Sequence, residues 1–431
     1  MDQTGSDAAA KPVPSLAEAF ATFTKVGLLS FGGPAAQISV MHRLLVDEKR
    51  WLSERQFLNA LSFCMLLPGP EAMQLATYSG WRLHGVRGGL MAGLLFVLPG
   101  AAVMLALAWL YAAYGTLPVI GALVLGVKAA VLVVVIEALL RVAKKALDGR
   151  AHWVIAAAAF VGIFFLALPY PLIVVLAAGY GFFFDARGGA AAHPVGKVAS
   201  AGSTAATVAL WLAVWILPLV AVDLWSGAAI LGDIGAFFSK LAVVTFGGAY
   251  AVLAYMAQAV VGDFGWLSAG EMMDGLGLAE TTPGPLILVT EFVGFVAAFH
   301  AGGTGLALAG AAVTLWATFA PCFLWIFAGA PYIEWISAQP RLSGALSAIT
   351  AAVVGVILNL SLWFGLHVMF TSVARAEYGP LVLWRPELAT LDWRVAALTL
   401  MCAVLMLRLH WGILRVLALS AALGWGLATF I

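Results

Sequence analysis

The sequence contains one block of residues twice, and the two copies lie 215 positions apart. Residues 23–70 align with residues 238–285 without a gap and share 15 identities in 48 positions. The shared motifs are Phe-Gly-Gly at 31–33 and 246–248, Trp-Leu-Ser at 51–53 and 266–268, and Pro-Gly-Pro at 68–70 and 283–285. Unrelated apolar helices would share mainly alanine and leucine, so these matches show that the chain is built from two homologous units.

The composition places both units in a lipid bilayer. Apolar residues make up 63% of the chain, charged residues 10%, and the mean hydropathy is +1.01. A soluble domain carries about 25% charged residues, so this chain lacks the polar surface that water requires. The net charge of +1 offers no field for nucleic acid. We expect an all-α polytopic membrane protein, in contact with lipid, with about 11–13 transmembrane segments of about 20 residues in two repeats.

We divide the chain into four parts by its apolar segments and polar connections. A cytoplasmic tail spans 1–16, the first repeat 17–185, a linker with one extra helix 186–235, and the second repeat 236–431. The predicted segments are 17–45, 56–84, 89–114, 118–140, 152–168, 170–185, 206–224, 236–261, 270–299, 304–328, 342–370, 393–408 and 411–430.

The loop charges indicate that the repeats have opposite orientations in the membrane. The connection after the first segment holds Arg43, Lys49, Arg50 and Arg55, whereas its counterpart, 258–270, holds no lysine or arginine. Cytoplasmic loops collect positive charge, so the two connections belong to opposite faces. Six segments before the linker and the extra helix give an odd number of crossings, which inverts the second copy. This count fails if 56–84 enters and leaves on one side.

Both repeats interrupt their helices at the same two motifs, Phe-Gly-Gly and Pro-Gly-Pro. Proline cannot continue a helix, and glycine permits unusual dihedral angles. Non-helical backbone at membrane depth requires surrounding protein or a water-filled cavity, so four breaks at symmetric positions predict a central cavity. Packing kinks without a ligand are the alternative.

The breaks and two lysines give the predicted cavity a positive character. Each break creates a helix N-terminus, near residues 35, 71, 250 and 286, and such termini attract anions. Lys25 and its counterpart Lys240 precede the Gly-Gly pairs by two turns. A lysine within a membrane segment is costly and marks function by default, although Lys25 could instead extend to the interface. These features favour an anionic substrate.

Carboxylates near the Pro-Gly-Pro motifs are candidates for proton coupling. Glu71 directly follows the first motif, Glu280 precedes the second, and Glu291 lies two turns beyond it. Buried carboxylates carry protons in coupled transporters, but a helix-capping role explains Glu71 equally well. Gln74, Thr281, Thr282 and Thr290 could donate hydrogen bonds to an oxyanion.

Two basic clusters are better explained by position than by chemistry. Arg82 and Arg87 lie where the segment after the first Pro-Gly-Pro ends, as an interfacial cluster or as an access funnel for anions. Arg141, Lys144, Lys145 and Arg150 form the densest basic loop, which we assign to the cytoplasmic face without a binding role.

Signatures of enzymes and of cofactor or metal binding are missing from the sequence. There is no GxSxG, HExxH or Walker motif, and Cys64, Cys322 and Cys402 are far apart. We therefore expect no catalytic residues, no metal and no cofactor, and transport that uses an ion gradient or runs downhill.

The motifs together resemble the chromate transporter family in its long, two-domain form. The resemblance rests on Phe31-Gly32-Gly33-Pro34, Trp51-Leu52-Ser53 and Pro68-Gly69-Pro70-Glu71, and on their counterparts from Phe246 to Pro285. It covers both halves, roughly 17–185 and 236–430. It implies export of chromate across the cytoplasmic (inner) membrane by proton exchange, which gives chromate resistance. A transporter or channel for sulfate or another divalent oxyanion is the alternative, and a homodimer is one possible assembly.

The second repeat departs from the first at three positions. Ala249 replaces Pro34, Leu286 replaces Glu71 and Val289 replaces Gln74, so the first repeat should carry more of the polar chemistry. The predicted substrate-binding residues are Lys25, Phe31, Gly32, Gly33, Pro34, Pro68, Gly69, Pro70, Gln74, Lys240, Phe246, Gly247, Gly248, Thr282, Pro283, Gly284 and Pro285.

Overall fold

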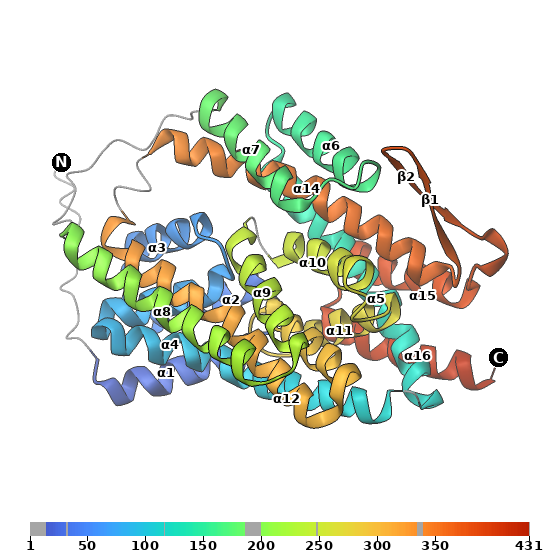
Figure 1. Cartoon of the computed structure of the whole chain (residues 1–431), viewed down its shortest axis with the longest axis horizontal. Coiled ribbons are helices and arrows are strands. Elements are labelled where there is room, and N and C mark those ends of the chain that lie inside the picture. The colour runs from blue at the N-terminus through green and yellow to red at the C-terminus, as the bar shows by residue number, and fades with distance from the viewer. Residues whose placement is uncertain are drawn as a thin grey trace.

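The computed structural model describes residues 14–31, 33–115, 117–185, 200–246, 249–333 and 339–430. Most helices run roughly along the long axis of the molecule, with α3 at one end and α16 and a β-hairpin at the other (Figure 1). Among the described residues, five helices are long and apolar enough to cross a membrane. These are α4 (Glu71–Tyr114), α5 (Pro118–Ala146), α8 (Ala201–Trp225), α12 (Val289–Gly329) and α14 (Pro340–Met369). The predicted all-α polytopic membrane fold is confirmed.

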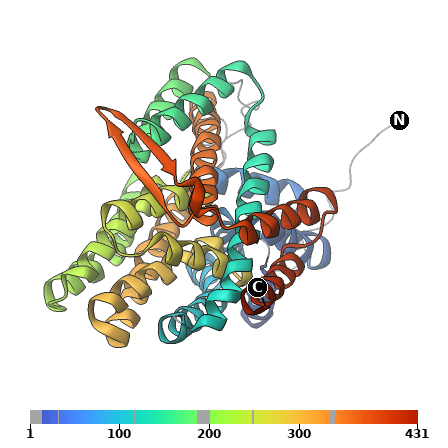
Figure 2. The ribbon, with the colours of Figure 1, turned by 90° about the vertical axis from the view of Figure 1, so that its right-hand side faces the viewer.

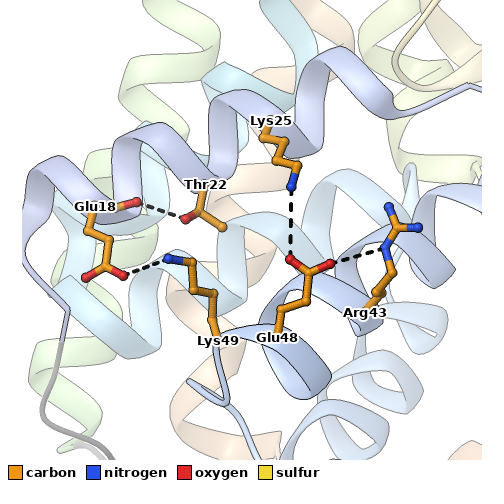
Figure 3. A network of polar contacts seen from close by, with 6 residues as sticks. All are labelled: Glu18, Thr22, Lys25, Arg43, Glu48 and Lys49. Carbon is orange, nitrogen blue, oxygen red and sulfur yellow. Dashed lines mark hydrogen bonds and ion pairs between the residues drawn. The ribbon is translucent and has the colours of Figure 1, made fainter.

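The first two helices of each repeat form a hairpin, which we call the first hairpin of that repeat. In the first repeat, Lys49 after the returning helix pairs with Glu18 at the start of the entering helix, at 2.9 Å (Figure 3). In the second repeat, the rings of Phe237 and Phe264 pack at 5.2 Å across the hairpin. The elements are α1 (Leu16–Leu29), α2 (Gly33–His42) and a π-helical turn (Arg43–Glu48), then α9 (Ala229–Val244), α10 (Ala249–Gln258) and a π-helical turn (Ala259–Asp263).

A second hairpin follows in each repeat, with Pro-Gly-Pro at its tip. The rings of Phe63 and Tyr78 lie 6.4 Å apart across one hairpin, and His300 contacts Glu271 at 3.2 Å across the other. Both entering helices begin with a capping box, one of them at Ser53. The elements are α3 (Glu54–Leu66) with the first part of α4, then α11 (Ala269–Thr281), a 3-10 turn (Leu286–Leu288) and the first part of α12.

Both α4 and α12 reverse direction at a glycine. In α4, Gly80 packs directly against the backbone of Gly88, whereas residues eight apart in one straight helix are about 12 Å apart. The reversal occurs at Gly85, and in α12 at Gly303, both with positive φ (61° and 75°), a conformation that glycine adopts most readily. After the reversal, each chain continues as a full-length crossing.

The two repeats have opposite orientations. Both ends of the first hairpin lie on one side of the molecule, the α1 face, and the long part of α4, α5 and α8 then cross three times. The second repeat therefore begins on the other side, the α9 face. Asp274 near the start of α11 confirms this placement, since it accepts a 2.7 Å hydrogen bond from Tyr111 at the far end of α4.

The remaining helices form two shorter hairpins, and one connection forms a β-hairpin. Helices α6 (Arg150–Phe164) and α7 (Tyr170–Phe184) are joined by His152 and Asp185 at 3.0 Å. The other elements are 3-10 turns at Ala330–Tyr332 and Leu388–Thr390, β1 (Val373–Tyr378) antiparallel to β2 (Leu381–Pro386), α15 (Trp393–Ala403), a π-helical turn (Val404–Arg408) and α16 (Ile413–Phe430). Figure 2 views the molecule from the end that carries β1 and β2.

The structure corrects the predicted segments in two respects. Segments 17–45, 56–84, 236–261 and 270–299 are hairpins that enter and leave on one face, because each chain turns back at its Gly-rich or Pro-rich break. The predicted count of seven crossings before the second repeat is therefore wrong, and the observed three are also odd, so the inversion holds. The β-hairpin was not expected. Residues 1–13 of the predicted tail and residues 186–199 of the predicted linker lie outside the described residues. The extra helix predicted in the linker is α8.

Candidate functional site

The hairpin tips of the two repeats meet in the middle of the molecule and bond to each other. The backbone N–H of Gly284 donates to the carbonyl oxygen of Ser30 at 2.7 Å, and that of Gly69 donates to Thr245 at 2.9 Å. The Gln37 side chain also donates to the Gly284 carbonyl oxygen at 2.7 Å. Each Pro-Gly-Pro tip is thus held by the first hairpin of the other repeat.

Glycine is required at the centre of both Pro-Gly-Pro tips. Gly69 has a φ of 117° and Gly284 a φ of 86°, values that L-residues rarely adopt. A Cβ atom at Gly69 would lie 3.0 Å from the sulfur of Cys322 and 2.9 Å from the amide nitrogen of Gln74. The motif is therefore needed for the close approach of the tips, whatever they bind.

A cavity of about 440 Å³ extends from these tips toward the α1 face, and we call it the α1-face cavity. Its volume lies within the usual range for small-ligand sites of about 300–1,000 Å³. It is bounded by both hairpins of the first repeat, the start of α10, the end of α5 and the start of α14. Its polar or tip residues are Pro34, Gly69, Glu71, Arg141, Lys145, Asp148, Tyr250, Ser347 and Thr350.

Three helix N-termini open onto this cavity. Helix α2 contributes Pro34 in its first turn, α4 begins at Glu71, and α10 contributes Tyr250 at its second position. The unpaired N–H groups of a helix start carry a partial positive charge and bind anions. The fourth predicted N-terminus begins with a buried apolar 3-10 turn, Leu286–Leu288, and does not line the cavity.

The α5 helix adds two cations to the cavity wall. Arg141 and Lys145 lie one turn apart near its end, and Arg141 also pairs with Glu137 at 2.6 Å. Two carboxylates face the same cavity, Glu71 and Asp148, and Asp148 contacts the buried His152 at 2.7 Å. An anion in the cavity would therefore meet the two cations and two carboxylates. Of the two carboxylates, Glu71 forms no ion pair among the described residues.

Glu280 lies behind the cavity wall and is connected to it through Tyr250. The Tyr250 hydroxyl donates a hydrogen bond of 3.0 Å to the Glu280 carboxylate, and Glu280 is buried in α11. Glu291 is only 1% exposed, and its Oε2 has no hydrogen-bond partner among the described residues. Taking a charged carboxylate out of water costs several kcal/mol, so a permanent charge is costly at both positions. The role of these residues as proton carriers stays a prediction.

The structure does not bring the two predicted lysines to this cavity. Lys25 is half exposed and its ammonium lies 4.0 Å from Glu48, which also contacts Arg43 (Figure 3). Lys240 lies on the α9-face side, over the ring of Tyr255 at 5.9 Å. The two symmetric lysines are therefore on opposite sides of the molecule, as the inverted repeats require. Their role as anion ligands stays a prediction.

The other predicted residues fall into four groups. The amide nitrogen of Gln74 donates to the Pro68 carbonyl oxygen at 2.7 Å and supports the tip from within. Arg82 and Arg87 lie at the reversal of α4, outside the cavity lining. The tips themselves hold Phe31, Gly33, Pro70, Phe246, Thr282, Pro283 and Pro285. Gly32, Gly247 and Gly248 lie outside the described residues.

Sequence reasoning missed the cations that do line the cavity. Arg141 and Lys145 were interpreted as a topology signal, because their sequence position at the end of a segment is typical of a cytoplasmic loop. Their spacing of four residues places them on one helix face, which was the available signal. Tyr250 and the ion pair of Lys128 with Asp274 at 3.0 Å carried no signal in the repeat alignment.

This combination defines a polytopic membrane protein of inverted repeats with a charged cavity at the repeat interface, a design typical of secondary transporters. The sequence model of the chromate transporter family matches residues 17–182 and 232–425. The chain belongs to this family.

Relatives of the chain cover most of both repeats. The chromate transport protein of Pseudomonas aeruginosa is 37% identical over 368 residues, which is 82% of each chain. The chromate transport protein of Cupriavidus metallidurans is 30% identical over 347 residues, or 80% of this chain and 82% of the relative. An uncharacterized transporter of Methanocaldococcus jannaschii is 25% identical over 421 residues, or 96% of this chain and 94% of the relative. No solved structure matches the chain.

Proposed function

We propose that the chain transports chromate, or a closely similar divalent oxyanion, through the α1-face cavity. The observation that carries the proposal is the convergence of three helix N-termini with Arg141 and Lys145 on one cavity. Helix N-termini and charged side chains both donate hydrogen bonds to oxyanions, and hydrogen bonds to ionised groups are the strong ones.

We propose chromate as the substrate because relatives of the chain are named for chromate transport. Two of them are named chromate transport proteins, and each aligns over at least four fifths of this chain. Sulfate has the same charge and tetrahedral shape, and the cavity offers only charge and N–H groups to either ion. We therefore expect sulfate to compete with chromate for the cavity.

We further propose that the α1 face is cytoplasmic and the membrane is the inner membrane. Arg43, Arg50 and Arg55 lie in the connection that leaves the first hairpin at this face, and cytoplasmic faces carry such charge. Single cysteines at Glu48 and Asp263, in a chain without its native cysteines, should react with an impermeant reagent from opposite sides. Reaction of both from one side would contradict the inversion.

We propose export as the direction of transport, with chromate resistance as its consequence. The exit of a dianion from a cell with a negative interior is favourable by about 4.6 kcal/mol per 100 mV of membrane potential, because each charge contributes about 2.3 kcal/mol. Proton exchange, for which Glu280 and Glu71 are the candidate carriers and Glu291 a third, would add the pH gradient. Uptake by everted vesicles that is indifferent to a collapsed pH gradient would rule out proton exchange.

The test of the function is chromate uptake by everted vesicles that carry matched variants. Arg141→Gln and Lys145→Gln should each raise the KM for chromate about tenfold, since a hydrogen bond to a charged group contributes about 1.5–3 kcal/mol. Lys144→Gln is the control, because Lys144 neighbours Lys145 in sequence but does not line the cavity. Equal KM values in all three variants would contradict the proposed site.

A further inference from the structure

A second cavity, of about 410 Å³, lies at the α9 face, and we call it the α9-face cavity. It shares no lining residue with the α1-face cavity. Its walls come from the first hairpin of the second repeat, the tip between α6 and α7, the end of α14 and the β-hairpin. The residues used in the argument are Lys240, Tyr255, Trp363, His367, Arg375 and Trp384.

The end of α14 at this cavity corresponds to the end of α5 at the first cavity under the inversion of the repeats. Helices α5 and α14 both begin at a proline, and Trp363 and His367 stand 222 positions after Arg141 and Lys145, as Pro340 stands after Pro118. Each pair lines the cavity at the end of its own helix. At these two equivalent helix positions, the second repeat thus has rings where the first repeat has cations.

Two other cations serve the α9-face cavity in their place. The Lys240 ammonium lies over the Tyr255 ring at 5.9 Å and forms no ion pair among the described residues. Arg375 reaches the cavity from β1, and its guanidinium also contacts the exposed Glu377 at 3.1 Å. Asp263 is the single carboxylate in the lining, so the cavity presents a net positive charge.

The β-hairpin is an addition that completes this cavity. Helices α5 and α6 are joined by residues 147–149, whereas the equivalent link between α14 and α15 carries β1 and β2. Arg375 and Trp384 pair in register across the strands, and both line the cavity. The N–H of Val382 donates to the Phe165 carbonyl oxygen at 2.7 Å, which fixes the hairpin to the α6–α7 tip. The inserted β-hairpin therefore forms one wall of the cavity and contributes the cation Arg375 to it.

We propose that the α9-face cavity is a second oxyanion site, where Lys240 and Arg375 bind the anion on the release side of the membrane. This inference rests on the proposed function. Its cations lie on separate elements, so the site should bind more weakly than the α1-face cavity. Weak binding suits release, since conduction requires an ion to leave each site as readily as it enters.

The test is inhibition of chromate uptake by sulfate preloaded inside everted vesicles, where the α9 face is exposed to the lumen. Lumenal sulfate should occupy the second site and slow wild-type uptake. Lys240→Gln and Arg375→Gln should raise the lumenal sulfate concentration for half-inhibition about tenfold. Arg385→Gln is the matched control, because Arg385 lies on the same hairpin, over Tyr378 at 5.4 Å, and does not line the cavity.

Two results would overturn the inference, and they differ from each other. If both variants take up chromate normally and are half-inhibited at the same lumenal sulfate concentration as the wild type, the second site is refuted and the proposed function is not. Wild-type vesicles that take up no chromate would refute the proposed function as well. Arg375 is partly exposed on a surface hairpin, so its variant keeps the test valid if Lys240→Gln fails to fold.

Discussion

The buried ion pair between Lys128 and Asp274 allows a sharp test of how the two repeats are joined. The ammonium of Lys128 on α5 lies 3.0 Å from one carboxylate oxygen of Asp274 on α11, and Tyr111 donates to the other oxygen at 2.7 Å. The Asp274 side chain is 9% exposed and that of Lys128 is 23% exposed. The cluster joins α4 and α5 of the first repeat to α11 of the second, close to the α9 face.

The difference in exposure predicts unequal effects of removing each partner. Lys128→Met leaves the buried Asp274 charge alone, and breaking a buried pair in this way costs about 3–5 kcal/mol. Asp274→Asn leaves Lys128, whose longer side chain can reach solvent, so we expect the smaller cost of about 1–3 kcal/mol for an unpaired polar group. The double variant removes both charges and should recover most of the loss, because apolar replacement of a whole pair is often neutral.

The assay is a double-mutant cycle on the free energy of unfolding, measured by SDS titration of the purified protein in bicelles. We expect the order of cost to be Lys128→Met above Asp274→Asn, with the double variant less destabilised than Lys128→Met alone. The coupling energy should be at least about 3 kcal/mol, at the upper end of the range for contacting residues, because the double variant recovers most of the summed cost of the two single changes. Additive effects, or a coupling energy below about 1 kcal/mol as for exposed pairs, would refute the assignment of a buried structural pair.

Three further predictions concern the tips and the α1-face cavity. Gly100→Ala should prevent folding, because the added Cβ would overlap the Pro283 carbonyl oxygen. Gly121→Ala is the control and should leave membrane abundance unchanged, since a Cβ there meets no atom within 4 Å. Equal membrane abundance of the two variants would contradict the close approach of Gly100 to the second Pro-Gly-Pro tip. Gln37→Leu should lower the free energy of unfolding by about 1 kcal/mol through loss of its bond to the tip, and an unchanged SDS midpoint would count against that bond. Asn59→Asp combined with Thr350→Lys should create a pair equivalent to the one at the α9 face and slow chromate uptake in everted vesicles, more than either single change does.

The helix breaks could be predicted from the sequence because their cause is local. A proline in a helix removes a backbone donor and clashes with the preceding turn, and glycine at Gly69 or Gly284 is needed for a positive φ. These effects depend on the residue and its neighbours in sequence. The repeat alignment then showed that the same local cause acts at two equivalent places.

Whether a broken helix continues or turns back could not be predicted. A run such as 56–84 is long enough for one crossing of about 30 Å, and equally suited to a hairpin of two half-length helices. The decision lies in contacts between distant residues, such as the packing of Gly80 on Gly88 and the bonds of Gly69 and Gly284 to the opposite repeat. Those contacts depend on the fold as a whole.

The cavity cations were missed for a related reason. Arg141 and Lys145 lie near the end of a predicted segment, where basic residues usually mark the cytoplasmic interface. In the structure, the end of α5 instead lies beside the hairpin tips, so the same residues line the α1-face cavity. Lys25, which the sequence favoured as a ligand, lies in the first hairpin of the first repeat, and its ammonium lies 4.0 Å from Glu48.

One difference between the two repeats lies in the contacts that join them near the α9 face. At the α9 face, Lys128, Asp274 and Tyr111 bind the repeats together. Asn59 in the first repeat is equivalent to Asp274 in the second, and Thr350 in the second repeat is equivalent to Lys128 in the first. Neither Asn59 nor Thr350 carries a charge, and Thr350 lines the α1-face cavity. At these equivalent positions, an ion pair therefore joins the repeats near the α9 face but not at the α1 face. The shared scaffold therefore supplies the hairpins and tips, whereas the differences between the copies make the two faces unlike in charge.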